Sequence, residues 1–141
     1  DRGLEARGFT DAELVTLSFK DCCLIPEKVL SSTAKRAKKT AEIFIKNLEI
    51  NFDKIEFDKN LYDFSGENLI KTIKQTPDNL DILMVFGHNN AITDFVNTFG
   101  DMPIENVPTS GLVVIEFRVE SWKYICKGQT IKVIFPRDLR A

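Results

Sequence analysis

The sequence predicts an α/β fold: a three-layer sandwich with a mixed but mostly parallel central sheet and helices on both faces. Two observations predict this class. In the first two thirds of the chain, short apolar runs typical of buried strands alternate with segments whose apolar residues recur at helical spacing. In the last third, apolar and polar residues alternate between turn signals, as in a β-meander. The 141 residues are 43% hydrophobic and 28% charged, which suits a single domain over 1–141 with a sizeable core.

The first half of the chain carries signals for two helices and two strands. The expected elements are a loop over 1–8, a helix over 10–20, a strand over 28–30, a helix over 34–48 and a strand over 54–57. Thr10, followed three residues later by Glu13, is typical of a capping box and predicts the start of the first helix. The hydroxyl-bearing residues 31–33 are expected to supply N-cap oxygens for the second helix.

The second half begins with two further helices around the clearest strand. The expected elements are a helix over 66–74, a strand over 82–86, a helix over 91–99, a loop over 100–109, paired strands over 112–117 and 121–127, a last strand over 130–135 and a tail from 136. Residues 82–86 are consecutive apolar residues, which is typical of a buried strand. Trp122 is expected to pack within its strand.

Charge and composition exclude several classes of function. The formal net charge of −2 and the pI near 5.5 argue against general nucleic-acid binding, which needs a basic face. No apolar run approaches the roughly 18 residues of a membrane span, and no signal peptide is visible. The three cysteines, at 22, 23 and 126, lack zinc-site spacing, so we expect free thiols in the core of a cytoplasmic protein. With one histidine and no thiolate cluster, the sequence implies neither a metal nor another cofactor.

The only histidine, His88, follows an expected strand and one glycine, and a helix begins after it. Such strand-to-helix corners lie at the carboxyl ends of strands in α/β proteins, where ligands bind. A histidine there can act as a base, a nucleophile or a phosphate ligand. The alternative is a structural histidine at a turn.

A second corner of the same kind follows the strand over 28–30. Its helix start offers unpaired N–H groups and the positive end of a helix dipole, which favour an anion. Arg36 borders the apolar stripe of that helix, so its guanidinium can reach over the carboxyl edge of the sheet and hold a phosphate through two hydrogen bonds. The alternative is a solvated basic face shared with Lys35, Lys38 and Lys39, in which Ser31 and Ser32 are only helix caps.

Both corners resemble motifs of the histidine phosphatase superfamily, the phosphoglycerate-mutase-like proteins. Residues 31–41 read SSTAKRAKKTA, which is similar to the SSxxxRAxxTA element of that superfamily, and Gly87-His88-Asn89 resembles its second histidine motif. Within the superfamily, the short chain is similar to the SixA-type phosphohistidine phosphatases. Weaker similarities to that type lie at 1–8, 61–63, 107–111 and 136–139.

The resemblance implies a phosphoglycerate-mutase-like fold and covalent catalysis. In the superfamily, a histidine in an Arg-His-Gly motif on the first strand attacks phosphorus, and water hydrolyses the resulting phosphohistidine. Arg36 matches the second arginine of the family and His88 its second histidine, which both hold the phosphoryl oxygens and stabilise charge. Ser32 and Asn89 are expected to add hydrogen bonds to the phosphate.

The sequence departs from the family pattern at the nucleophile, because it contains no Arg-His-Gly. The region that matches starts just after the place of that motif, so the first, central strand is missing as well. Loss of a central strand leaves two buried strand edges unpaired, which favours a truncated chain over a natural pseudoenzyme. As written, the chain is expected to hold half a site and not to turn over.

The general acid is also open. Asp63, Glu67 and Glu105 are the candidates, and Asp63 is the one retained, although a phosphohistidine substrate has a good leaving group and can do without a strong acid. Few residues are left for a lid, which favours a protein-borne phosphoryl group. The resemblance therefore implies a phosphatase acting on phosphohistidine in a signalling or phosphotransfer protein, such as a phosphotransfer domain. The alternatives are a phosphatase for small phosphate esters and an inactive phosphate-binding module.

Overall fold

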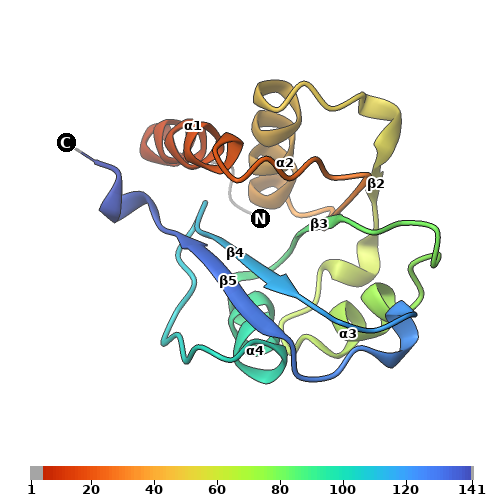
Figure 1. The fold of residues 1–141 in the computed structure, drawn as a ribbon. Helices are drawn as coiled ribbons and strands as arrows, with labels where there is room; N and C mark the ends of the chain where they lie inside the picture. The colour runs from red at the N-terminus through yellow and green to blue at the C-terminus, as the bar shows by residue number, and fades with distance from the viewer. Residues whose placement is uncertain (1–4, 141) are drawn as a thin grey trace.

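The computed structural model describes residues 5–140 and confirms the α/β class (Figure 1). Its helices and strands are α1 (Ala6–Lys20), β1 (Lys28–Ser31), α2 (Lys35–Asn47), β2 (Ile55–Phe57), α3 (Glu67–Lys74), β3 (Leu83–Phe86), α4 (Asn89–Phe99), β4 (Leu112–Glu116) and β5 (Gln129–Ile134). Short 3₁₀ helices lie between them: η1 (Phe52–Lys54), η2 (Lys59–Leu61), η3 (Trp122–Tyr124) and η4 (Pro136–Asp138). Most of the expected elements are therefore present within a few residues of their expected bounds.

The strands form two sheets. One is parallel, in the order β2-β1-β3, and the other is the antiparallel pair β4-β5, with an irregularity between Val114 and Ile115. Within residues 5–140, β3 pairs only with β1 and β4 pairs only with β5. The expected mixed sheet is thus divided between β3 and β4, although both sheets lie in one layer of the fold.

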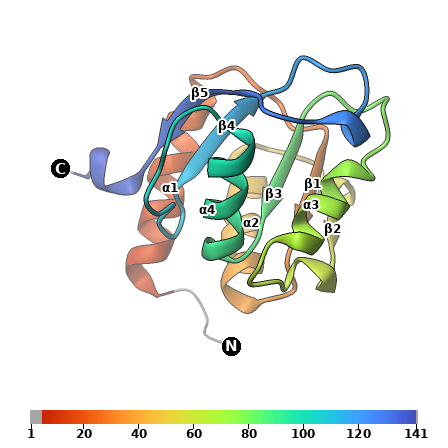
Figure 2. The ribbon, with the colours of Figure 1, turned by 90° about the horizontal axis from the view of Figure 1, so that it is seen from below.

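The layers are visible in the ribbon. Figure 1 shows α1 and α2 above the strands and α3 and α4 below them, and Figure 2 gives the same arrangement from below. Side chains alternate along β3: Leu83 and Val85 pack against a cluster that includes α3 and α4 residues, whereas Met84 and Phe86 pack against one built on α1 and α2. The alternation confirms a strand with apolar cover on both faces, as expected for a three-layer sandwich.

The first helix begins earlier than the sequence predicts. The expected N-cap at Thr10 is wrong, because α1 starts at Ala6 with Glu5 as its N-cap, and the Thr10 hydroxyl donates to the Ala6 carbonyl inside the helix at 3.3 Å. Alanine and arginine are strong helix formers and extend the helix backwards across Gly8. Of the loop expected over 1–8, residues 6–8 are therefore helical, and residues 1–4 lie outside the described part of the chain.

The expected strand over 121–127 is wrong. This segment contains η3, and β4 pairs instead with β5. Polar anchors hold the segment in a turn: Asp78 accepts hydrogen bonds from the Ser121 hydroxyl and the Trp122 backbone N–H, and the Trp122 indole donates to the Leu80 carbonyl at 2.7 Å. Trp122 does pack against the core, but from a 3₁₀ turn. These long-range anchors override the apolar alternation of the sequence.

The cysteines and the C-terminal segment also differ from expectation. Cys22 is half-buried and Cys23 and Cys126 are exposed, so the expected core position of the cysteines is wrong, although all three are free thiols. The segment from residue 136, which was expected to be a tail, contacts the rest of the fold. The Arg140 guanidinium forms a two-point ion pair with the buried Asp11 carboxylate, which fastens the C-terminal segment to α1.

Candidate functional site

A cleft of about 760 Å³ separates the two sheets. Both β3 and β4 line it along their length, and side chains from α2 and α4 close its two faces. The Ile82 and Phe86 carbonyls accept hydrogen bonds from the β1 side, so the peptide groups of Leu83 and Val85 between them face the cleft. The cleft is therefore bounded by two strand edges that carry hydrogen-bonding backbone groups, and not by side chains alone.

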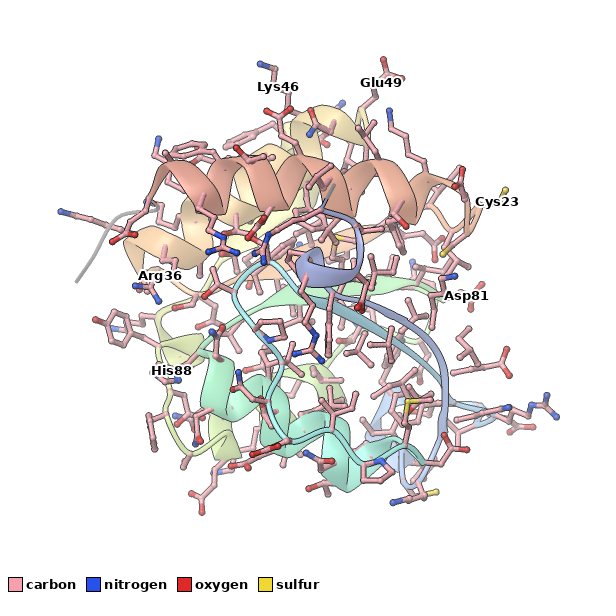
Figure 3. The ribbon with its side chains drawn as sticks, turned by 90° about the vertical axis from the view of Figure 1, so that its left-hand side faces the viewer. Cys23, Arg36, Lys46, Glu49, Asp81 and His88 are labelled. Atoms are coloured by element: carbon pink, nitrogen blue, oxygen red, sulfur yellow. The ribbon has the colours of Figure 1, made fainter. Side chains whose placement is uncertain are left out.

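Four of the predicted site residues gather at one end of this cleft. Ser32, Arg36, His88 and Asn89 all line it, at the carboxyl ends of β1 and β3. Figure 3 shows the labelled Arg36 and His88 side chains at the same end of the molecule, with Asp81, which precedes β3, at the opposite end. The two corners that the sequence singles out thus meet at one site.

The β1–α2 corner is rigid and buried. The Ser31 hydroxyl donates to the Ser32 carbonyl, and the Ser32 hydroxyl oxygen accepts from the Ala34 N–H at 3.1 Å. The Ser32 N–H donates to the Phe86 carbonyl at 2.8 Å, which ties this corner to the end of β3. Both serines are buried. The serines therefore fix the approach to α2, but the expected N-cap role of residues 31–33 is wrong, because Ala34 is the N-cap and no side chain caps the helix.

Arg36 lies in the first turn of α2 and is half-buried. No hydrogen bond or ion pair engages its guanidinium among residues 5–140, and no acidic residue lies in the first turn of α2. A cation at the positive end of a helix dipole is unfavourable unless an anion lies beside it. Arg36 and the open N–H groups of α2 together therefore favour a bound anion.

His88 is the N-cap residue of α4 and is exposed. Its Nδ1 accepts a hydrogen bond from the Asn90 N–H at 3.1 Å. A ring nitrogen that accepts a hydrogen bond carries no proton, so the proton of the neutral imidazole lies on Nε2. The Phe64 ring packs edge-on against the imidazole, with 4.8 Å between ring centroids. The helix cap and the phenyl ring therefore fix His88 with Nε2–H as its available donor.

Asn89 joins α4 to the loop before β4. Its side-chain amide donates to the Thr109 hydroxyl at 3.2 Å, and Ser110, next in that loop, has a φ of +66°. The amide has a second N–H that this contact does not use. Asn89 thus holds the 107–111 loop at the mouth of the cleft and keeps one donor for a ligand.

The loop between η2 and α3 is held by its own polar groups. The Asp63 carboxylate accepts from the Asn68 N–H at 2.8 Å and from the Ser65 hydroxyl at 3.1 Å. Burial raises the pKa of Asp63, but these hydrogen bonds outweigh it and hold the pKa below its ordinary value of 3.8. The Asn90 side chain donates to the Phe64 carbonyl at 3.0 Å, which fastens this loop to α4.

Two residues that sequence reasoning did not select lie beside the predicted ones. Tyr62 lines the cleft and Phe64 packs on His88. Tyr62 falls within the weak family similarity at 61–63, whereas the only signal for Phe64 is an aromatic residue in a polar loop, which the sequence does not connect to the histidine. By contrast, Asp63, Glu67 and Glu105 are not among the cleft-lining residues.

Within residues 5–140, no group of three or more histidine, cysteine or acidic side chains could hold a metal ion. None of the helices in the described part of the chain combines the length and apolar character needed to cross a membrane.

Three of the solved structures that match this chain in fold are SixA proteins. A candidate phosphohistidine phosphatase SixA from Agrobacterium tumefaciens matches 95% of this chain and 83% of its own, at 26% identity and a TM-score of 0.76. The protein histidine phosphatase SixA complexed with tungstate matches at 20% identity and a TM-score of 0.77, over 99% of this chain and 87% of its own. A further SixA candidate, from Nakamurella multipartita, matches at 16% identity and a TM-score of 0.73, over 96% of this chain and 86% of its own.

Sequence comparison adds nothing to these likenesses, because no family model and no curated protein matches the chain. The assignment depends instead on the fold and on the two motifs. The serine–arginine element and the Gly-His-Asn corner lie at the carboxyl ends of adjacent parallel strands, and three SixA structures share the surrounding fold. The chain therefore has the fold of the SixA structures, and its two motifs lie together at one end of the cleft.

Proposed function

We propose that this protein is a phosphohistidine phosphatase, a hydrolase that removes the phosphoryl group from a phosphorylated histidine in a signalling or phosphotransfer protein. One observation carries the proposal: an arginine without a protein partner among the described residues and a histidine with its Nε2–H available line the same end of one cleft. The names of the similar structures support the same activity.

The phosphoryl group is held by complementary charge and hydrogen bonds. The Arg36 guanidinium binds two phosphoryl oxygens, and the His88 Nε2–H donates to another. Ser32 and Asn89 border the same space and each keep a hydroxyl or amide proton for the phosphate. Arg36 is positively charged, so it binds the phosphoryl group more strongly as negative charge develops on its oxygens, which lowers the barrier.

The nucleophile must come from a residue other than His88. The Nδ1 atom of His88 is occupied as a helix cap, and its Nε2 carries the proton, so neither nitrogen offers a lone pair for attack. We propose that an extended strand in the cleft between β3 and β4 carries the nucleophilic histidine. The two strand edges that bound the cleft offer the backbone pairing such a strand needs, and its carboxyl end reaches the phosphate site if it runs parallel to β3.

The reaction then proceeds in two displacements. A nitrogen of the nucleophilic imidazole forms a bond to phosphorus while the phosphorus–nitrogen bond to the substrate histidine breaks, and the released imidazole takes up a proton. Water next attacks phosphorus while the bond between phosphorus and the nucleophilic imidazole breaks, and the proton lost by the water passes to the released imidazole or to solvent, which yields inorganic phosphate and the free nucleophile. Asp63 remains the candidate general acid, although its lowered pKa and its place outside the cleft suit a role in holding the loop.

The substrate is a phosphorylated histidine-containing protein. The site lies at the mouth of the cleft, and His88 is exposed, so a phosphohistidine on a protein surface can reach it. A phosphotransfer domain is the partner that this open site suits best. We place the protein in the cytoplasm, where such signalling proteins act and where its three free thiols stay reduced.

The test is an assay of the full-length protein on a phosphotransfer domain phosphorylated at its histidine. We expect release of inorganic phosphate by the wild type and its loss in His88→Ala. No release by the wild type, at enzyme concentrations up to that of the substrate, would contradict the proposal. Release from small phosphate esters but not from the phosphoprotein would favour a small-molecule phosphatase. Binding of phosphate without any turnover would favour a non-catalytic phosphate-binding module.

A further inference from the structure

Two aromatic side chains at the site are largely exposed. Tyr62 is 57% and Phe64 65% exposed, and they are two residues apart on the loop that contacts α4. Single exposed apolar residues are common and need no explanation. These two, which we call the aromatic rim, differ because Tyr62 lines the cleft and Phe64 packs against the imidazole of His88.

The aromatic rim is held in place before any ligand binds. The Asp63 carboxylate fixes the loop to the start of α3, and Asn90 fixes the Phe64 carbonyl to the start of α4. Gly66, the N-cap of α3, has a φ of +89°, a conformation that glycine adopts without strain. Aromatic residues that are ordered in advance contribute strongly to protein–protein binding, because little conformational entropy is lost when they are covered.

A basic surface flanks Arg36. Residues 35–39 of α2 include three lysines, at 35, 38 and 39, which we call the basic turn. The Lys38 ammonium lies 5.0 Å from the centre of the Phe57 ring, and Lys39 makes only an exposed ion pair with Glu42 at 3.9 Å. An exposed ion pair of this kind contributes little to stability, so Lys39 can exchange it for a carboxylate of a partner. The Lys38 ammonium can attract a partner's carboxylate as well.

We propose that the aromatic rim and the basic turn together form the docking surface for the protein substrate. The inference rests on the proposed function. The partner is a protein whose phosphorylated histidine is flanked by an apolar side chain, which covers Tyr62 and Phe64, and by carboxylates, which face Lys38 and Lys39. The aromatic rim adjoins the predicted phosphate ligand His88, so a phosphoryl group at the site brings the substrate surface onto it. A small phosphoramide is too short to touch either surface.

The test compares two substrates that have the same phosphorus–nitrogen bond. One is a phosphotransfer domain phosphorylated at its histidine, and the other is phosphoramidate. In the full-length protein, we expect Tyr62→Ala to raise KM for the phosphoprotein about fivefold or more. Phe64 is left in place in this test, because its ring orients His88. We expect kcat/KM for phosphoramidate to change less than threefold. The double variant Lys38→Glu, Lys39→Glu should lower kcat/KM for the phosphoprotein and weaken its dependence on salt.

Tyr124→Ala is the matched control, because Tyr124 is 64% exposed, lies in η3 and is not among the residues that line the cleft. It should change neither substrate. If Tyr62→Ala leaves the phosphoprotein KM unchanged, or lowers kcat/KM equally for both substrates, the docking surface is disproved while the activity stands. If the wild type hydrolyses neither substrate, the proposed function itself fails, and this inference with it.

Discussion

The neighbouring parallel strands β1 and β3 differ in an unexpected way: β3 (LMVF) has the more apolar sequence, but β1 (KVLS) is the more buried strand. β1 pairs on both edges, and its Val29 and Leu30 are 0% and 6% exposed. Among the described residues, β3 pairs on one edge only, and all four of its residues are half-buried. Apolar clusters cover both faces of β3, so its lower burial comes from the cleft along the edge that does not pair with β1. Side-chain packing on its two faces therefore does not bury β3 fully, because one strand edge faces the cleft.

The comparison also separates the roles of the two corners. The β1–α2 corner, beside a fully paired strand, is buried and supplies a charged group, Arg36, on a rigid support. The β3–α4 corner, beside the open edge, supplies His88, whose orientation depends on its own helix cap and on Phe64. The proposed site needs one group from each corner, and it needs the open edge of β3 to be filled.

The largest expected effect comes from removing either group that holds the phosphate. Arg36→Ala and His88→Ala should each lower kcat on phosphohistidine by about 100- to 1,000-fold, because a charge-stabilising donor is lost in the transition state. Steady-state assays of phosphate release would measure this.

His88→Asn is the matched control for folding, because asparagine also caps helices well but does not reproduce the Nε2–H donor. It should keep the melting temperature of the wild type and lose activity. Activity in His88→Asn close to that of the wild type would show that the imidazole is only a structural cap.

A smaller effect is expected on stability, where matched substitutions in β1 and β3 compare the two strands directly. Leu30 of β1 and Leu83 of β3 pack in the same apolar cluster, but Leu30 is buried and Leu83 only half-buried. In the 141-residue chain, in which β3 faces the cleft, Leu30→Ala should lower the free energy of unfolding by about 3 kcal/mol. In the same chain, Leu83→Ala should lower it by about 1 kcal/mol. Urea unfolding of the two variants measures both. Equal losses would mean that β3 is as well packed as β1 and that the cleft is closed in solution.

The smallest effect concerns the loop beside His88. The pKa of Asp63 is lowered in the folded state, so the ionised carboxylate stabilises the fold above pH 3.8, and this contribution is lost as the pH falls through the lowered value. Asp63→Asn should therefore melt at a lower temperature than the wild type at pH 7. The two melting temperatures should converge once the pH falls below that lowered pKa. A gap that persists in acid would show that Asp63 does not act through its charge.

Local patterns were sufficient for much of the fold and for part of the site. The helical spacing of α2 and the apolar run of β3 predict those elements, and the two motifs predict that Arg36 and His88 lie at strand ends. Contacts between distant segments were not predictable. The Asp78 and Leu80 anchors of Trp122 override a strand pattern, and the contact of Phe64 with His88 joins residues that no periodicity relates.

The most direct test of the central claim is a crystal structure of the full-length protein grown with tungstate, a tetrahedral oxyanion like phosphate. We predict one tungstate ion bound by the Arg36 guanidinium and the His88 Nε2. We also predict an extended strand between β3 and β4 that pairs with the free peptide groups of Leu83 and Val85 and ends in a histidine beside the ion. Tungstate bound elsewhere, or β3 and β4 paired directly to each other, would contradict the account.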